Sequence, residues 1–385
     1  MSIIDRYIAR QFLINTLVLL VILACFVVAI DVSLNLDRFI TIADEMSSVE
    51  GARPDIEPTA LRTGLITIFL IADFWWPKLL QLYNYLIGIV LVGAMGFTCA
   101  QLVKNRELVA VLAAGQSLQR IAKPILVVAL LFTGVQLANQ ELALPQVAPL
   151  VTRDHGDAGR RLLGTTQLPL TRDGLGRYWF ATKFDADRGT LADVSVWERN
   201  DRGLATRQIS ASAAQWREGG WDLVDGVADP RLVVEGMAAS PTPIDRIETD
   251  LDPVAIKMRR YAGFSQALSW RQLGQMIAIS RQIDPDSPQG DAERQSLQRV
   301  RFGRLSVMAS NILALVVTLP FFLTRVPKPM VVQSIKCAPI AIVALMGGVV
   351  GAALPVPGVP AAISAFLPVM VLLPIALAQV STVRT

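Results

Sequence analysis

Six apolar segments with the character of membrane-spanning helices constrain the fold of this chain more than any other feature. They cover residues 12–30, 79–103, 124–138, 305–323, 338–354 and 362–380. A helix that crosses the hydrocarbon core of a bilayer needs about 20 mainly apolar residues. The whole sequence is 52% hydrophobic and only 18% charged, a balance that excludes an ordinary soluble protein. We therefore expect a polytopic membrane protein with one water-exposed domain.

The first apolar run follows a charged start, an arrangement that it shares with secretory signal peptides. Residues 22–25, Ile-Leu-Ala-Cys, also resemble a lipoprotein cleavage site, but the apolar run continues to Ile30. We therefore expect an uncleaved first helix. Residues 31–62 are polar and predict an external loop, and the short apolar segment 65–74 ends at Trp75-Trp76-Pro77-Lys78. Because tryptophan and lysine gather at the headgroup level, that segment predicts an elbow at the membrane interface.

The long polar segment between the third and fourth runs predicts an inserted β domain. From residue 178 to 234 it consists of short strand-like pieces separated by turn signals, the pattern of an all-β sandwich or jelly roll. Residues 270–282 have helical periodicity and 284–290 form a proline-containing linker. The predicted fold is an α-helical integral membrane protein with six transmembrane helices and an inserted all-β periplasmic jelly-roll domain. The predicted parts are a membrane half (1–144), the β domain (145–265), a connector (266–303) and a second membrane half (304–385).

Basic residues near the ends of the spans predict the orientation, because they are enriched on the cytoplasmic side. The basic residues on one predicted side are Arg6, Arg10, Lys104, Arg106, Arg120, Lys123, Arg325, Lys328, Lys336 and Arg384. The connection 355–360, on the other side, carries no charge. Arg38, Arg53 and Arg62 count against this assignment. The balance predicts that both termini are cytoplasmic and that the β domain lies outside the cytoplasm.

The basic stretch between the second and third runs is a candidate for contact with a soluble partner. Leu108, Val111, Leu112 and Gly115 recur at three- and four-residue spacing, so a helix over about 104–117 presents one apolar face. Such a helix can lie on the cytoplasmic face of the membrane and receive a push from a partner. The alternative is an ordinary cytoplasmic loop with a helical turn.

The sequence lacks the motifs of the common enzyme classes. It contains no G-x-x-x-x-G-K-[ST], H-E-x-x-H or G-x-S-x-G pattern. Its three cysteines lie in or beside apolar runs and its one histidine is remote from them, so we expect no disulfide, metal or cofactor. The spans carry almost no ionisable groups, which ion-coupled carriers usually need near the bilayer midplane. These features indicate a transporter whose energy comes from a separate ATPase.

Gly347 and Gly351 form a small-xxx-small pair on the fifth span. Such pairs allow two helices to approach closely. The pair is equally compatible with a contact between subunits and with packing inside the chain.

Several segments resemble lipopolysaccharide export permeases of the LptF/LptG (YjgP/YjgQ) type. They are IIDRYIARQFL at 3–13, KNRELVA at 104–110 with Ala114-Gly115, Asn139-Gln140-Glu141 with Pro145, GGWDLVDG at 219–226 and LSWRQL at 268–273. In this order and topology they cover most of the chain. The N-terminal segment leans towards LptG, although the sequence leaves the choice between the two paralogues open.

The resemblance implies a six-span half-transporter in the inner membrane that carries lipopolysaccharide or a related lipid. It implies three kinds of partner: a cytoplasmic LptB-like ABC ATPase dimer, a paralogous LptF-like permease, and LptC/LptA-like periplasmic bridge proteins. By the same resemblance, Glu107 and the face around Leu108, Val111 and Leu112 would dock in a groove of the ATPase. The first and fifth spans would line the gate where lipid enters. We expect no nucleic-acid partner and no catalytic residues in this chain.

One departure from the family concerns the headgroup of the lipid. The family places basic residues near the outer end of the first span, where this chain has Asp31 and Asp37 with only Arg38. Arg301 and Arg304, with Arg299, at the start of the fourth span are alternative contacts for sugar phosphates. The competing hypothesis for the whole chain is a membrane-anchored scaffold or sensor whose β domain binds a partner without transport.

Overall fold

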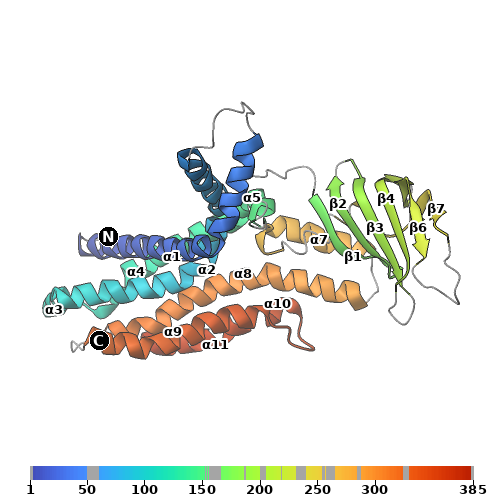
Figure 1. The fold of residues 1–385 in the computed structure, drawn as a ribbon. Coiled ribbons are helices and arrows are strands. Elements are labelled where there is room, and N and C mark those ends of the chain that lie inside the picture. Colours follow the sequence, from blue (N-terminus) through green and yellow to red (C-terminus); the bar gives the residue numbers. More distant parts are fainter. Residues whose placement is uncertain are drawn as a thin grey trace. The chain divides into compact units, whose positions relative to one another are not determined.

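The computed structural model describes residues 3–49, 60–151, 153, 155, 166–185, 188–199, 205–217, 219–230, 240–253, 256, 265–283, 288–323 and 329–382. The chain divides into two compact units, one formed by Met1–Gly159 with Ser265–Thr385 and the other by Arg160–Phe264. The first unit contains the long helices and the second contains the β-strands (Figure 1).

Within the described residues, six helical segments are long and apolar enough to span a membrane. The helices that form them are α1 (Ile3–Val49), α2 (Ala60–Lys104), α4 (Leu118–Ala138), α8 (Pro288–Phe322), α9 (Met330–Ala353) and α11 (Leu367–Thr382). A π-helical turn, η1 (Asn139–Ala143), joins α4 to α5 (Leu144–Val151), and α10 (Ala361–Ser364) precedes α11. The remaining helices are α3 (Glu107–Ala113), the 3-10 turn η3 (Ser265–Ala267) and α7 (Trp270–Ile283). The predicted fold class, a six-span helical membrane protein with an inserted β domain, is confirmed.

The predicted external loop at 31–62 is wrong over the part that the structure describes. Helix α1 continues to Val49 and α2 begins at Ala60, while residues 50–59 lie outside the described ranges. Phe39 of α1 and Phe74 of α2 are both fully buried in one apolar cluster between the two helices, and their rings meet edge-on at 5.6 Å. Because pairing buries an apolar stripe on each helix, this stretch is helical despite its polar composition.

The predicted interfacial elbow is a bend inside a continuous helix rather than a separate segment. Helix α2 passes through Pro77, and Figure 1 shows α1 and α2 each changing direction along their length. Proline removes one backbone hydrogen bond and crowds the preceding turn, which is a common cause of such a bend. The Nζ atom of Lys78 lies 3.5 Å from the centre of the Phe74 ring.

Three other predicted spans begin earlier than expected. Helix α4 begins at Leu118 rather than at Pro124, α8 at Pro288 rather than in the fourth apolar run, and α9 at Met330 rather than at Ala338. The predicted linker at 284–290 is therefore helical from Pro288, and its first four residues lie outside the described ranges. Pro124, Pro320, Pro339 and Pro374 all lie inside helices. Membrane helices tolerate proline because neighbouring groups satisfy the freed backbone atoms.

The six helices share one apolar core. Its fully buried members include Phe12 of α1, Ile87 of α2, Ile125 of α4 and Leu315 of α8. Close approach of α2 and α8 depends on Gly88, because a Cβ atom there would lie 2.5 Å from the Asn311 Oδ1 atom. Small residues let helices approach in this way.

The second unit is a single antiparallel sheet. Its strands are β1 (Thr166–Arg172), β2 (Tyr178–Asp185), β3 (Thr190–Arg199), β4 (Ala205–Arg217), β5 (Gly220–Val224), β6 (Val227–Pro230), β7 (Thr242–Pro243) and β8 (Arg246–Glu248). The order is β1-β2-β3-β4-β5-β8, and β6 pairs with both β4 and β7. The predicted β domain is confirmed as antiparallel, and its jelly-roll arrangement stays a prediction.

The sequence pattern predicts one strand at 221–227 and another at 231–236. Residues 221–227 contain most of β5 and the start of β6, and the pairing of β4 explains the division. The second half of β4 pairs with β5 and its first half with β6. The chain turns between them at Asp225, whose φ of 54° is left-handed. The predicted strand at 231–236 lies outside the described residues.

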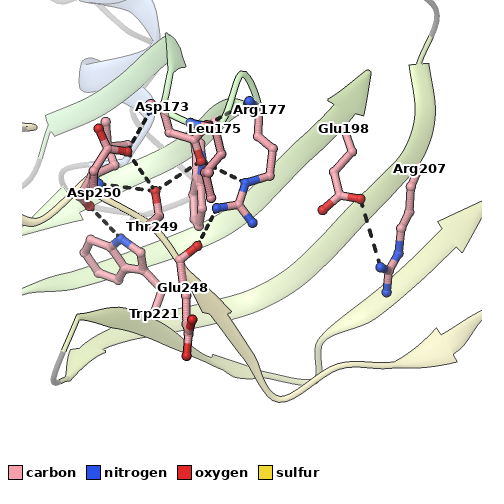
Figure 2. Close-up of polar contacts among 12 residues, drawn as sticks. Asp173, Leu175, Arg177, Glu198, Arg207, Trp221, Glu248, Thr249 and Asp250 are labelled. Atoms are coloured by element: carbon pink, nitrogen blue, oxygen red, sulfur yellow. Dashed lines mark hydrogen bonds and ion pairs between the residues drawn. The ribbon is translucent and has the colours of Figure 1, made fainter. Parts of the chain in front are cut away.

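A buried aspartate holds the strand ends of this sheet together (Figure 2). Asp173 accepts hydrogen bonds from the Trp179 indole at 3.0 Å, the Thr249 hydroxyl at 3.1 Å and the Arg177 side chain at 2.8 Å. Burial by itself raises the pKa of Asp173. The hydrogen bonds from the Trp179 indole and from the Arg177 backbone and side chain, with the Arg177 charge, together lower the pKa below its ordinary value.

Candidate functional site

The short helix α3 connects α2 to α4 through two left-handed turns. Arg106, with φ 60°, separates α2 from α3, and Gly115, with φ 73°, follows α3. A glycine adopts this conformation without steric cost. The Gly115 N–H donates to the Leu112 carbonyl at 2.9 Å. The predicted helix at 104–117 is therefore shorter, because the backbone reverses on both sides of it.

The predicted docking face of α3 packs against the helical unit itself. Leu108 is only 3% exposed, and Val111 and Leu112 are half-buried against the same core. The outward side of α3 carries Val109, which is 45% exposed, and Ala110. Docking of an ATPase through Leu108, Val111 and Leu112 stays a prediction, and the exposed residues beside them form the surface that a partner can reach.

Glu107 links α3 to the first helix. Its Oε1 atom accepts hydrogen bonds from the Tyr7 hydroxyl at 3.0 Å and from the Asn105 side-chain amide at 3.1 Å. Its Oε2 atom is buried and has no hydrogen-bond partner in the described part of the chain. The carboxylate therefore has a position that α1 and the preceding turn define.

A ladder of amide side chains continues this link along α1 and α2. Gln101 Oε1 accepts from Gln11 Nε2 at 2.8 Å and from Asn15 Nδ2 at 3.0 Å, and Asn15 also donates to Thr98 at 2.9 Å. The sequence analysis considered ionisable groups in the spans and did not identify these amides. Asn and Gln in or beside apolar runs could have indicated the contact, because such side chains form hydrogen bonds between membrane helices.

At the other end of the helical unit, η1 and α8 hold the segment that follows the β-strands in the sequence. The Glu141 Oε2 atom accepts from the Trp270 N–H at 2.8 Å, and Gln140 donates to the Gln266 carbonyl at 2.9 Å. Arg304 donates to the carbonyls of Leu268 and Ser265. Together these bonds tie η3 and the start of α7 to the ends of two membrane helices.

The three arginines predicted to contact substrate occupy different surroundings. The Arg301 guanidinium lies 4.2 Å from the centre of the Trp270 ring, and Arg304 binds backbone carbonyls as described above. Arg38 is exposed on α1. Asp31 accepts from the Trp75 indole at 3.1 Å, and His155 Nε2 lies 3.1 Å from each of its oxygens. Asp31 therefore has a structural role at the place where basic residues were expected.

The sequence matches the family described as lipopolysaccharide export system permease LptF/LptG over residues 59–380. The chain belongs to the LptF/LptG family. The match covers most of the chain and includes α3, the β unit and the last five of the six candidate membrane spans. Comparison with curated proteins gives no match. The predicted family is confirmed, and with it a role as a transport permease.

The glycine pair on the fifth span of this permease has two different environments. A Cβ atom on Gly351 would lie 2.6 Å from Pro368 Cγ, and one on Gly348 would lie 2.8 Å from Ser310 Cβ. A Cβ atom on Gly347 would meet nothing within 4 Å. Gly351 thus packs inside the chain, whereas the predicted role of Gly347 at a subunit contact stays a prediction.

An apolar cavity of about 670 Å³ lies between α8, α9 and α11 of the permease. Gly347, Gly351, Val343 and Pro368 are among its lining residues, and none of the lining residues that the structure describes is charged. A cavity of this composition has room for hydrocarbon chains and offers no group that would fix a headgroup.

Proposed function

We propose that this permease is one membrane half of an ABC transporter that extracts lipopolysaccharide, or a related lipid, from the inner membrane. A separate cytoplasmic ATPase dimer would supply the energy, and a paralogous permease would complete the membrane part. The β domain would lie in the periplasm and pass the lipid to bridge proteins. Membership of the LptF/LptG family supports a transport role, and these finer assignments go beyond it.

The position of α3 is the observation that best supports coupling to an ATPase. The helix lies between two membrane-spanning helices and exposes Val109 and Ala110, while Leu108 and Glu107 fix it to the core and to Tyr7. A force on its outer side is therefore carried into α1 rather than absorbed by a loose loop. Extraction of an acyl chain from a bilayer costs about 0.8 kcal/mol per methylene, so an external energy source is required.

Co-purification tests the proposal. We expect the permease, expressed with its candidate ATPase and purified in detergent, to retain the ATPase and to hydrolyse ATP as a complex. Val109→Asp should release the ATPase, because it places a charge on the exposed side of α3. Val227→Asp, on β6, is the matched control, since Val227 is 40% exposed and lies in the β unit. If the folded permease never retains an ATPase, that result would favour the competing hypothesis of a membrane-anchored scaffold or sensor.

Orientation is tested separately by cysteine labelling. Cys25, Cys99 and Cys337 are free thiols, so they are first replaced by serine or alanine. In that background we expect Thr182→Cys in β2 to react with an impermeant maleimide added to whole cells, and Gln116→Cys to react only after lysis. The reverse pattern would place α3 outside the cytoplasm and would end the coupling assignment.

A further inference from the structure

A cavity of about 380 Å³, lined by both polar and apolar residues, lies at the end of the helical unit where η1 and α8 meet. Gln136 of α4, Arg299 and Arg304 of α8, and Val349 and Ala352 of α9 are among its lining residues. Ligand pockets commonly measure about 300–1,000 Å³. The cavity therefore has room for one compact group, and its lining offers both polar and apolar side chains.

Three polar groups around this cavity have unused hydrogen-bonding capacity. Gln136 is 3% exposed and its amide N–H donates to the Asn84 carbonyl at 3.0 Å, but its Oε1 atom is buried without a partner among the described residues. The Arg304 Nε–H is buried and likewise unpartnered there. Arg299 has neither an ion pair nor a hydrogen bond within the described ranges. Buried polar groups in native structures normally have partners, so these groups call for a ligand.

The balance of these groups specifies the chemistry of that ligand. Arg299 and Arg304 both line the cavity, and none of its described lining residues carries a carboxylate. Glu141 lies with Arg304 at a neighbouring pocket and already accepts the Trp270 N–H at 2.8 Å. Guanidinium groups with free N–H donors suit a phosphate. The free Gln136 oxygen needs a donor beside that phosphate, which an amine or a hydroxyl supplies. A phosphodiester headgroup carries both.

The apolar wall distinguishes a lipid from a soluble phosphate. Val349 of α9, which lines the cavity, is 45% exposed. Val350 of α9 is 49% exposed, and Leu354, directly after the helix, is 56% exposed. Because α9 is a candidate membrane span, this surface faces hydrocarbon. An acyl chain can follow α9 while its headgroup occupies the cavity. The volume suits one headgroup rather than a phosphorylated sugar with several chains.

We propose that this cavity binds the phosphodiester headgroup of a single bilayer glycerophospholipid, distinct from the transported cargo. Arg299 and the Arg304 Nε–H donate to the phosphate, and Gln136 Oε1 accepts from the amine or hydroxyl of the headgroup. The bound lipid thereby joins α4, α8 and α9. The proposal needs the permease only as a membrane protein, and its failure leaves the coupling proposal untouched.

Native mass spectrometry of the delipidated full-length permease in detergent tests this site. We expect phosphatidylethanolamine to bind with 1:1 stoichiometry and diacylglycerol, which lacks the phosphate, not to bind. Arg299→Gln should weaken phosphatidylethanolamine binding about tenfold, since it removes a charge-assisted contact. The control is Arg281→Gln on α7, an equal change of charge at an exposed residue outside the cavity. Equal lipid binding by Arg299→Gln and Arg281→Gln would overturn the proposal.

Two further arms identify the source of the phosphate. Inorganic phosphate at millimolar concentration should leave the bound lipid in place, and displacement would show a site for a free anion. Purified lipopolysaccharide should also leave it in place, and displacement would assign the cavity to the cargo instead.

Ser296→Glu provides a second variant that is safe for folding, because Ser296 is exposed at the rim. It should weaken binding by repulsion, and unchanged binding would contradict the proposal.

Discussion

The Tyr7 hydroxyl donates a hydrogen bond to Glu107 Oε1 across 3.0 Å and so joins the first membrane helix to the short helix α3. The two residues are 100 positions apart in the sequence. Gln11 and Asn15 extend the same contact from α1 to Gln101 on α2. These bonds make the ends of three helices move together, which is what transmission of a force from α3 into the membrane requires.

Removal of one hydroxyl should weaken this transmission. In a permease reconstituted with its ATPase, Tyr7→Phe should lower the amount of lipid released per ATP roughly fivefold, the equivalent of a net hydrogen bond worth about 1 kcal/mol. ATP hydrolysis itself should persist. Tyr178→Phe in β2 also deletes a hydroxyl and keeps the ring that the Arg199 guanidinium covers at 4.3 Å, so it should behave as wild type. A parallel loss of ATPase activity in Tyr7→Phe would argue for misfolding instead.

Position 107 should tolerate a neutral side chain that accepts hydrogen bonds and should not tolerate a cationic one. Glu107→Gln keeps one oxygen for Tyr7 and Asn105, so it should retain part of the transport activity. Glu107→Arg offers no acceptor and should abolish export while the permease stays folded and inserted. Transport assays with the ATPase still bound separate the two variants. Normal export by Glu107→Arg would remove Glu107 from the coupling path.

The two glycines of the fifth span should respond in opposite ways to alanine. Gly351→Ala places a methyl group 2.6 Å from Pro368 Cγ and should cost about 1–3 kcal/mol of stability through overpacking. Gly347→Ala meets nothing within 4 Å and should be neutral or stabilising by up to about 1 kcal/mol. Thermal denaturation in detergent measures both. If Gly347 lies at a subunit contact, Gly347→Leu should reduce co-purification of the partner permease without a change in stability.

Asp173 should make the β unit sensitive to acid. Its lowered pKa means that its stabilising contribution is complete above the ordinary pKa of 3.8 and is lost as the pH falls through the lower folded-state pKa. Asp173→Asn should cost about 3 kcal/mol at neutral pH, because it leaves the Arg177 guanidinium, which is only 14% exposed, without its carboxylate partner. The difference between variant and wild type should shrink below about pH 4, close to the ordinary aspartate pKa.

Pulse proteolysis with pepsin over an acidic pH series measures that difference on the full chain. Asp185→Asn is the control, because Asp185 pairs at 3.9 Å with an Arg188 side chain that is 84% exposed. An exposed pair contributes about 0–1 kcal/mol, so this variant should track wild type. A constant difference between Asp173→Asn and wild type at all pH values would contradict the assigned pKa shift.

The predictions from sequence failed where helices pair. The stretch at 31–62 contains prolines and charges and was expected to be a loop, but its described part is helical, and Phe39 packs there against Phe74 of α2. Leu108, on the predicted docking face of α3, is 3% exposed in the core of its own chain, and its contact with a partner stays a prediction. Periodicity identifies an apolar face of a helix, but it does not specify which surface covers that face.

The sequence alone determined the class of the protein, the six spans, the presence of an inserted β domain and the family. Each depends on composition, local periodicity or short motifs that neighbouring residues carry. Only the tertiary structure decided that Glu107 faces Tyr7, that Gly351 is packed and Gly347 open, and that Gln136 and Arg299 share a cavity. These relationships join residues that are far apart in the chain, because burial of apolar faces sets the distances between helices and thereby selects which polar groups meet.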